Sequence, residues 1–539
     1  MTSPATATPP GRAAPLFAAA ILPLAFLAWH LRFFVDDAFI VFRYAENWAN
    51  GLGPVYHEGE LVEGFSDLAW VLLMSLAARL GAPLDASAHL LSGLCTLATT
   101  ALAADVLARL PLSKAARYGG ALSVGLSADL AAWTTGGLET ALFTLALFGL
   151  WRELTRDGGG AALAALFGGL LVSARAEGVL WLVGVFFAVT VADRQRWRSH
   201  LQLIFPGLMV FALVLTWRMY TFGELLPNTV HAKAGMDGET LSRGLRYIAS
   251  WFVVSITPLI ATLLALRALR SPAAKLALSA GVLVDGGVLF ALLSGGDWMP
   301  FFRFLAPTVP FLAILIAAGL HGRDGRAGWR AALPLLGCLS AFGLHLLPAQ
   351  ARVALDFRGF KDGYETELER LEKARRNIPT WRMIGRALRE HAQEGDSIVL
   401  GAIGAIGYES GIRIHDRNGL IDPEVTRVAV RVPGRSAGHE RRVSRQRFLR
   451  PPLDRAPTWF AARAVKRPLS SVDEFAAREA AALVMRNVIA GDPRDDVLRD
   501  SCIPEIAPLG DDGSLLLLRY TEDTASARAY WERALREQP

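Results

Sequence analysis

The sequence predicts an α-helical domain with many membrane spans, followed by an α/β domain outside the membrane. Long apolar runs fill residues 14–348, whereas residues 349–539 mix charged and apolar residues as ordinary soluble domains do. Hydrophobic residues make up 52% of the 539 residues and charged residues only 20%, which is low for a chain of several soluble domains. Residues 1–13, rich in Pro, Ala and Thr, are expected to be disordered.

The apolar part divides into about eleven candidate spans. A helix needs about 20 apolar residues to cross about 30 Å of hydrocarbon. The candidate segments are 14–33, 86–109, 116–134, 138–152, 160–175, 177–193, 201–217, 247–267, 276–294, 302–320 and 331–348. Residues 66–80 form a shorter apolar stretch with Asp67 at its start and Arg79 near its end. We interpret this stretch as a helix lying in the membrane interface, within a first outer loop of residues 34–85.

The cations between the spans predict the orientation of the chain. With a cytoplasmic N-terminus, every cytoplasmic connection carries at least two Lys or Arg residues, as the positive-inside rule requires. Counting 66–80 as a span would place these cationic loops on the outer side. The sequence therefore predicts that residues 349–539 lie outside the cytoplasm. The net charge of +6 reflects these loops and one tail segment, so nucleic-acid binding is not indicated.

The tail combines helices, strands and one basic segment. Helices are expected near 363–376 and 379–393, and residues 396–416 read as a strand, a glycine turn, a short helix and a strand. The GxxGxxG spacing favours close backbone packing over a nucleotide site. Residues 427–466 carry eleven Lys or Arg residues. They predict contact with anionic lipid or an anionic polymer, or else a solvated loop. The three cysteines include no CxxC pair, and a disulfide framework is not expected.

The predicted outer loops hold six polar motifs. These are Asp36-Asp37, Glu63-Gly64-Phe65-Ser66, Gly136-Gly137-Leu138-Glu139, Arg175-Ala176-Glu177, the loop from Gly223 to Lys233, and the loop from Gly295 to Arg303. All six fall on one side of the membrane, although the spans were counted without reference to them. This co-location predicts a polar cavity at the outer face.

Such a cavity suits a substrate with one apolar end and one polar end, such as a lipid-linked sugar phosphate. The phosphate requires cationic or N–H partners, and we assign it Lys233, Arg303, Arg175, Asn228 and His231. The remaining polar residues are expected to line the pocket: Glu63, Glu139, Glu177, Asp297 and Trp298.

A carboxylate is needed to take the proton from an attacking acceptor hydroxyl. A twinned Asp suits this role, because a like-charged neighbour raises one of the two pKa values. We predict that Asp36 or Asp37 is the base and favour Asp36, the first of the pair. Alternatively, the pair binds a divalent cation, or caps the helix that follows it.

The other predicted site residues have structural alternatives as well. Glu139 is placed to cap the helix that follows it, because a carboxylate at a helix N-terminus is favoured by the helix dipole. Arg175 and Glu177 are close enough in sequence to pair with each other. Lys233 is near enough to the boundary to extend its ammonium toward lipid headgroups.

Residues 36–45, Asp-Asp-Ala-Phe-Ile-Val-Phe-Arg-Tyr-Ala, and the motif around Glu63 resemble the first outer loop of GT-C-fold glycosyltransferases. The likeness is strongest to the branch of terminal β-1,2-arabinofuranosyltransferases. Gly136-Gly137-Leu138-Glu139-Thr140, Leu226-Pro227-Asn228-Thr229 and the loop 295–303 are similar to further motifs of that branch. The resemblance implies a GT-C-like domain over 14–348 and a periplasmic α/β domain over 349–539.

The resemblance also implies a function. The chain is expected to transfer a sugar, arabinofuranose in this branch, from a polyprenyl-phosphate donor to a cell-envelope glycan or lipid, with inversion, at the outer face of a bacterial inner membrane. No cofactor is required beyond an optional divalent cation at Asp36 and Asp37. The alternatives are a flippase of lipid-linked sugars, which would carry polar residues at the membrane midplane, and a ligase of whole glycans.

Overall fold

The structure is a computed structural model whose contacts divide the chain into two compact units. One contains residues 1–35, 66–226 and 234–374, and the other contains 36–65, 227–233 and 375–539. The domain ranges 14–348 and 349–539 remain predictions, since the compact units group the segment 36–65 with the C-terminal part. The described residues are 13–233, 237–321, 342–343, 346–354, 365–431, 441–449, 456–469, 477–482, 484, 497–510 and 513–536.

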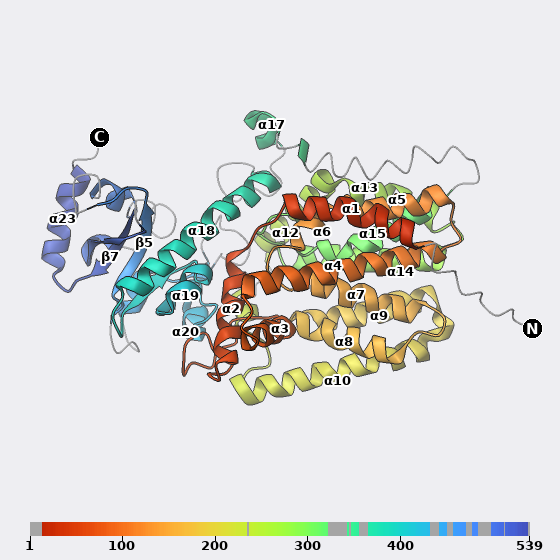
Figure 1. Ribbon diagram of the computed structural model, residues 1–539, viewed down its shortest axis with the longest axis horizontal. Coiled ribbons are helices and arrows are strands. Elements are labelled where there is room, and N and C mark those ends of the chain that lie inside the picture. The colour runs from red at the N-terminus through yellow and green to blue at the C-terminus, as the bar shows by residue number, and fades with distance from the viewer. Residues whose placement is uncertain are drawn as a thin grey trace, which may run out of the picture. The chain divides into compact units, whose positions relative to one another are not determined.

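The first unit consists of helices, many of which run side by side (Figure 1). They are α1 (Ala14–His30), α3 (Leu68–Arg79), α4 (Leu84–Arg109), α5 (Lys114–Gly125), α6 (Ala128–Trp133), α7 (Thr140–Thr155), α8 (Ala161–Ala174), α9 (Gly178–Ala192), α10 (Trp197–Phe222), α12 (Gly238–Ser255), α13 (Thr257–Ala268), α14 (Ala274–Leu293), α15 (Val309–Leu320) and α17 (Ala349–Ala354). α7 packs against α4, α8 and α9, and its Phe148 and Trp151 contact Phe311 of α15.

Among the described residues, three helical segments are long and apolar enough to cross a membrane: Leu84–Arg109, Arg194–Phe222 and Ala274–Leu293. A bent pair, α12 and α13, makes a fourth if it is counted as one span. Shorter apolar helices include α1, α8 and α9. The chain is therefore a multipass membrane protein with a helical membrane domain. The last predicted span, 331–348, falls almost entirely outside the described residues.

Residues 247–267, one of the predicted spans, do not form a single straight helix. The structure has α12 and α13 there, bent by 86° at Ile256. Ile256 adopts a φ of 49°, which is unfavourable for a β-branched residue, and Pro258 occupies the first turn of α13. A hydropathy count cannot detect this break, because the sequence around the bend stays mostly apolar. Only Ser255 and Thr257 are polar there.

The second unit joins α2 (Asp36–Ala49) and α11 (Asn228–Lys233) to the C-terminal part. Its sheet has the order β2-β1-β5-β7-β6, with β1 parallel to β2 and β5 and the other pairs antiparallel. The C-terminal elements are α18 (Glu367–His391), which begins in the first unit, then β1 (Ser397–Leu400), α19 (Gly404–Ser410), β2 (Arg413–Asp416), α20 (Pro423–Val428), β3 (Val430–Arg431), β4 (Arg441–Arg442), β5 (Trp459–Val465), α22 (Val497–Asp500), β6 (Cys502–Pro508), β7 (Ser514–Tyr520) and α23 (Thr524–Arg536).

The two helices predicted near 363–376 and 379–393 are one helix, α18, with Pro379 inside it. A proline removes one backbone hydrogen bond but does not always end a helix. The strand, glycine turn, short helix and strand predicted over 396–416 are confirmed as β1, α19 and β2.

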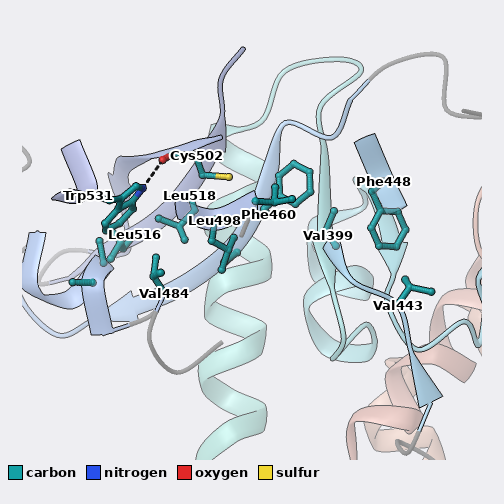
Figure 2. Packing of buried hydrophobic residues seen from close by; sticks show 14 of the residues in the cluster. Val399, Val443, Phe448, Phe460, Val484, Leu498, Cys502, Leu516, Leu518 and Trp531 are labelled. Carbon is teal, nitrogen blue, oxygen red and sulfur yellow. Dashed lines mark hydrogen bonds between the residues drawn. The ribbon is translucent and has the colours of Figure 1, made fainter. Parts of the chain in front are cut away.

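The core of the C-terminal sheet lies between its strands and α23. Figure 2 shows Leu516 and Leu518 of β7 in the same cluster as Phe460 of β5 and Trp531 of α23. The Trp531 indole N–H donates to the carbonyl oxygen of Cys502, 2.8 Å away. This bond satisfies the polar atom of a fully buried ring, so α23 is fixed to β6 as well as packed against the sheet.

Leu516→Ala is expected to destabilise the C-terminal sheet by about 2–5 kcal/mol, because it leaves a cavity in a close-packed core. Hydrogen exchange of β5 and β7 peptides in the full chain measures this as faster exchange. Ile503→Ala, on neighbouring β6 where the side chain is 37% exposed, is the matched control and should change exchange little. Equal exchange in the two variants would contradict the assignment of Leu516 to the core.

Candidate active site

The acidic pair lies at the start of α2. Asp36 and Asp37 occupy the first turn of that helix, and Asp36 is 7% exposed. The Asp36 carboxylate accepts two backbone hydrogen bonds from α19: Gly404 N donates to Oδ2 at 3.0 Å, and Ala405 N donates to Oδ1 at 2.7 Å. Both oxygens of Asp36 therefore already have N–H partners.

The environment of Asp36 favours its protonated form more than water does. Burial raises the pKa of Asp36 to about 6, although the amides of Ala405 and Gly404 oppose the rise. The charges of Asp37 and Asp416 add to it. Asp37 differs from its neighbour: it is half-buried, and its carboxylate has no hydrogen bond or ion pair within the described part of the chain. Asp37 is thus the member of the pair whose oxygens are available.

The other predicted residues of this unit lie in two segments. Asn228 is buried, and its amide group donates to the carbonyl oxygens of Gly419 and Leu420 at 2.7 and 2.8 Å. The backbone N–H of Asn228 donates to the carbonyl oxygen of Glu63, whose side chain is 3% exposed. Asn228 thus holds three backbone carbonyls in place. His231 is exposed on α11, and Lys233 ends that helix, with its side chain outside the described part.

The first unit brings the remaining predicted residues into a buried ionic cluster. Arg175 Nε lies 2.6 Å from Glu139 Oε1, and both side chains are about 5% exposed. Arg175 also donates to the Thr140 hydroxyl at 3.0 Å and lies 3.7 Å from Glu177. Glu139 precedes α7 without capping it, so the predicted cap is replaced by an ion pair.

A second ion pair is part of the loop 295–303. Arg303 Nε lies 2.7 Å from Asp297 Oδ2. The guanidinium groups of Arg175 and Arg303 lie over the ring of Phe304, at 6.0 and 5.1 Å from its centroid. Two cations thus share one aromatic ring, which links the predicted motifs at Arg175 and Arg303. Trp298 is half-buried, and its carbonyl accepts a hydrogen bond from Arg370.

The loop 295–303 is held in a strained backbone conformation. Phe301 and Phe302 adopt φ values of 52° and 46°, and both side chains are fully buried. Phe301 N donates to the Glu367 carboxylate at 2.6 Å, and the Trp133 indole donates to the carbonyls of Pro300 and Phe301 at 3.0 Å. Strain of this kind persists only where neighbouring groups enforce it, and it is concentrated at functional sites.

Sequence reasoning assigned Asp67 no chemical role, but Asp67 has the features of a site residue. It is 4% exposed, and its Oδ2 has no hydrogen-bond partner among the described residues. Burial, together with the charge of Glu139, holds the pKa of Asp67 well above its usual range. The available signal was a carboxylate beginning an apolar helix; its burial depends on helices distant in sequence.

A cation bound by the acidic pair would compete with groups that Asp36 already contacts. Both Asp36 oxygens accept backbone N–H groups, and a cation would have to displace them. Within the described residues, no three His, Cys, Asp or Glu side chains gather as metal ligands. A divalent cation at Asp36 and Asp37 stays a prediction.

Comparison with solved structures shows which fold the chain has. It is similar in structure to ArnT from Cupriavidus metallidurans, solved with undecaprenyl phosphate, with a TM-score of 0.53 and 14% identity over 76% of this chain and 88% of that one. The chain has the GT-C fold. This confirms the predicted GT-C-like helical fold, while the count of eleven spans stays a prediction.

Two curated relatives are terminal β-(1→2)-arabinofuranosyltransferases. The Mycobacterium tuberculosis protein is 26% identical over 59% of this chain and 57% of its own length. The Corynebacterium glutamicum protein is 27% identical over 39% of this chain and 34% of its own length. The chain therefore spans little more than half of the length of the first relative and about a third of the length of the second. Residues 366–481 also match the model of a domain of unknown function, DUF8728.

Proposed function

We propose that the chain is an inverting glycosyltransferase that moves a sugar from a polyprenyl-phosphate donor to a cell-envelope glycan or lipid acceptor. The observation that carries the proposal is the acidic pair of α2, on a chain that shares the ArnT fold and is similar to two arabinofuranosyltransferases. Arabinofuranose is the sugar we propose, because both relatives bear that name.

In the proposed mechanism, Asp37 takes the proton from the acceptor hydroxyl as that oxygen attacks the anomeric carbon of the sugar. The bond from the sugar to the phosphate breaks, and polyprenyl phosphate leaves with the bonding electron pair. The preference moves from Asp36 to Asp37, because both Asp36 oxygens accept amide N–H groups from Gly404 and Ala405. An acceptor hydroxyl would have to reach oxygens that these amides already contact, whereas the oxygens of Asp37 are available to it.

Charge stabilisation at the leaving phosphate is assigned to cations. Lys233 is the cation we favour as direct phosphate partner, with Asn228 and His231 in the same loop. Arg175 and Arg303 each have a carboxylate partner already, Glu139 and Asp297. We therefore propose that, within the first unit, these ion pairs shape the wall of the predicted pocket, together with Glu177 and Trp298.

The membrane arrangement proposed with this function keeps the eleven spans, the cytoplasmic N-terminus and the extracytoplasmic C-terminal part. The short helices α8 and α9 are then spans of 14 and 15 residues, and neighbours such as α10 shelter their ends. Since a lipid-linked donor carries its own activated sugar, the reaction needs no nucleotide at the outer face.

A transfer assay tests the proposal. Membranes that contain the protein are incubated with radiolabelled decaprenyl-phosphate arabinofuranose and, in parallel, with other polyprenyl-phosphate sugars. The expected result is labelled acceptor with inverted anomeric configuration, absent from membranes without the protein. Movement of labelled donor between leaflets without transfer would instead identify a flippase. Transfer of a preassembled glycan in preference to a single sugar would identify a ligase.

A further inference from the structure

One helix of the C-terminal part, α19, is held at both ends by side chains from the outer loop. The first N–H groups and last carbonyls of any helix lack partners within it. At the start of α19, the N–H groups of Gly404 and Ala405 donate to Asp36. At its end, the Arg43 guanidinium donates to the carbonyls of Gly407 and Gly411.

These two side chains come from the same face of α2. Asp36 and Arg43 are seven residues apart, which is about two turns of a helix, so both point the same way. Arg43 Nε also donates to the Tyr56 carbonyl at 2.9 Å, and the Tyr56 hydroxyl donates to the Ile403 carbonyl at 2.6 Å. Within this unit, α2 is therefore fixed at two points along its length by one short helix.

The glycines of the GxxGxxG segment are what permit this approach. A Cβ on Gly404 would overlap the backbone carbonyl of Asp36, and a Cβ on Gly407 would overlap the Tyr56 hydroxyl. Gly401 differs, because the nearest atom to a Cβ there is Asn418 Nδ2 at 3.4 Å, an ordinary contact. The second and third glycines of the motif serve the packing of α2 on α19, and the first does not.

We infer that α19 is a positioning element for the proposed base on α2, so that the domain of unknown function takes part in sugar transfer. Asp37 directly follows Asp36, and its direction is set by how α2 is held. Asp36, Gly404 and Gly407 are positioning residues in this account. The inference rests on the proposed function, since it concerns the geometry of the base in that reaction.

The first test compares Gly404→Ala with Gly401→Ala in the full chain, using the transfer assay. Displacing a reacting group by about 1 Å can cost roughly 100-fold in rate. Gly404→Ala should therefore lower kcat by about 100-fold with little change in KM for the donor. Gly401→Ala should stay within about twofold of the parent. Equal kcat values in the two variants would overturn the inference.

The second test uses Asp36→Asn, which keeps the shape of the side chain and so covers the case in which Gly404→Ala fails to fold. An Asn offers one acceptor oxygen where the carboxylate offers two. The variant therefore resembles the parent after Asp36 has taken up a proton. The titratable groups acting on Asp36 are Asp37, Asp416 and the Tyr56 hydroxyl, with the Arg43 guanidinium next to that ring.

The pH profile separates positioning from simple packing. The pKa of Asp36 is raised to about 6, so parent kcat should fall as the pH drops from 7.5 to 5 and Asp36 becomes protonated. The ratio of parent to Asp36→Asn kcat should be large at pH 7.5 and fall by roughly tenfold at pH 5, one pH unit below the pKa of Asp36. A ratio that does not change with pH would overturn the inference. If the parent itself shows no transfer at any pH, the proposed function fails instead.

Discussion

Replacing Asp37 with Asn is expected to lower sugar transfer by about 100-fold to 10,000-fold, the range that a positioned general base contributes. The proposed base would lose its ability to accept the acceptor proton, while the side chain keeps its size. Because the Asp37 carboxylate has no hydrogen bond or ion pair in the described part of the chain, folding should be little affected. The measurement is kcat in the transfer assay, with protein amount determined from the same membranes.

Glu46→Gln is the matched control for Asp37→Asn. Glu46 is an acidic residue of the same helix, α2, but its side chain is exposed. The control removes one negative charge near the site and should leave kcat within about twofold. Full activity of Asp37→Asn would exclude Asp37 as the base. An equal loss in Glu46→Gln would show that net charge, rather than proton transfer, is responsible.

Replacing Arg175 with Met is expected to destabilise the helical unit by about 3–5 kcal/mol, the usual cost of removing one partner of a buried ion pair. The change leaves the Glu139 carboxylate buried beside Thr140 without its cation. It also removes the guanidinium that lies 4.8 Å from the centroid of Phe143. Unfolding of the purified protein in mixed detergent micelles measures the free energy.

An exposed pair provides the comparison. Arg109 bonds Asp105 at 2.8 Å, but the Arg109 side chain is 54% exposed and Arg152 still pairs with Asp105 without it. Arg109→Met should therefore cost no more than about 1 kcal/mol. If Arg175→Met lowered the free energy of unfolding no more than Arg109→Met does, the Arg175–Glu139 pair would contribute little to stability. That result would contradict its assignment as a buried ion pair.

Much of the helical fold could be predicted from hydropathy alone. Segments such as 86–109 and 276–294 match α4 and α14 within two residues, because each is a long apolar run with polar ends. The bend at Ile256 and the continuous helix through Pro379 could not be predicted. Each is decided by packing with neighbours, and packing leaves no periodic signal in the local sequence.

The candidate site was predicted in its residue types more than in their partners. Glycines and carboxylates in predicted outer loops identified the motifs at Asp36, Glu139 and Asp297. The partner of Glu139 is Arg175, 36 residues away, and those of Asp36 are Gly404 and Ala405, more than 360 residues away. Asp67 was missed because its burial arises from helices that are distant in the chain.

For the acidic pair itself, the sequence by itself determined that two carboxylates begin a helix after an apolar segment, and its motifs indicated the GT-C fold. Only the tertiary structure decided how the two differ. Asp36 is buried against the start of α19 and accepts two N–H groups, whereas Asp37 has none. The physical reason is that hydrogen bonds and desolvation depend on which groups meet in space, and adjacent residues on a helix point about 100° apart.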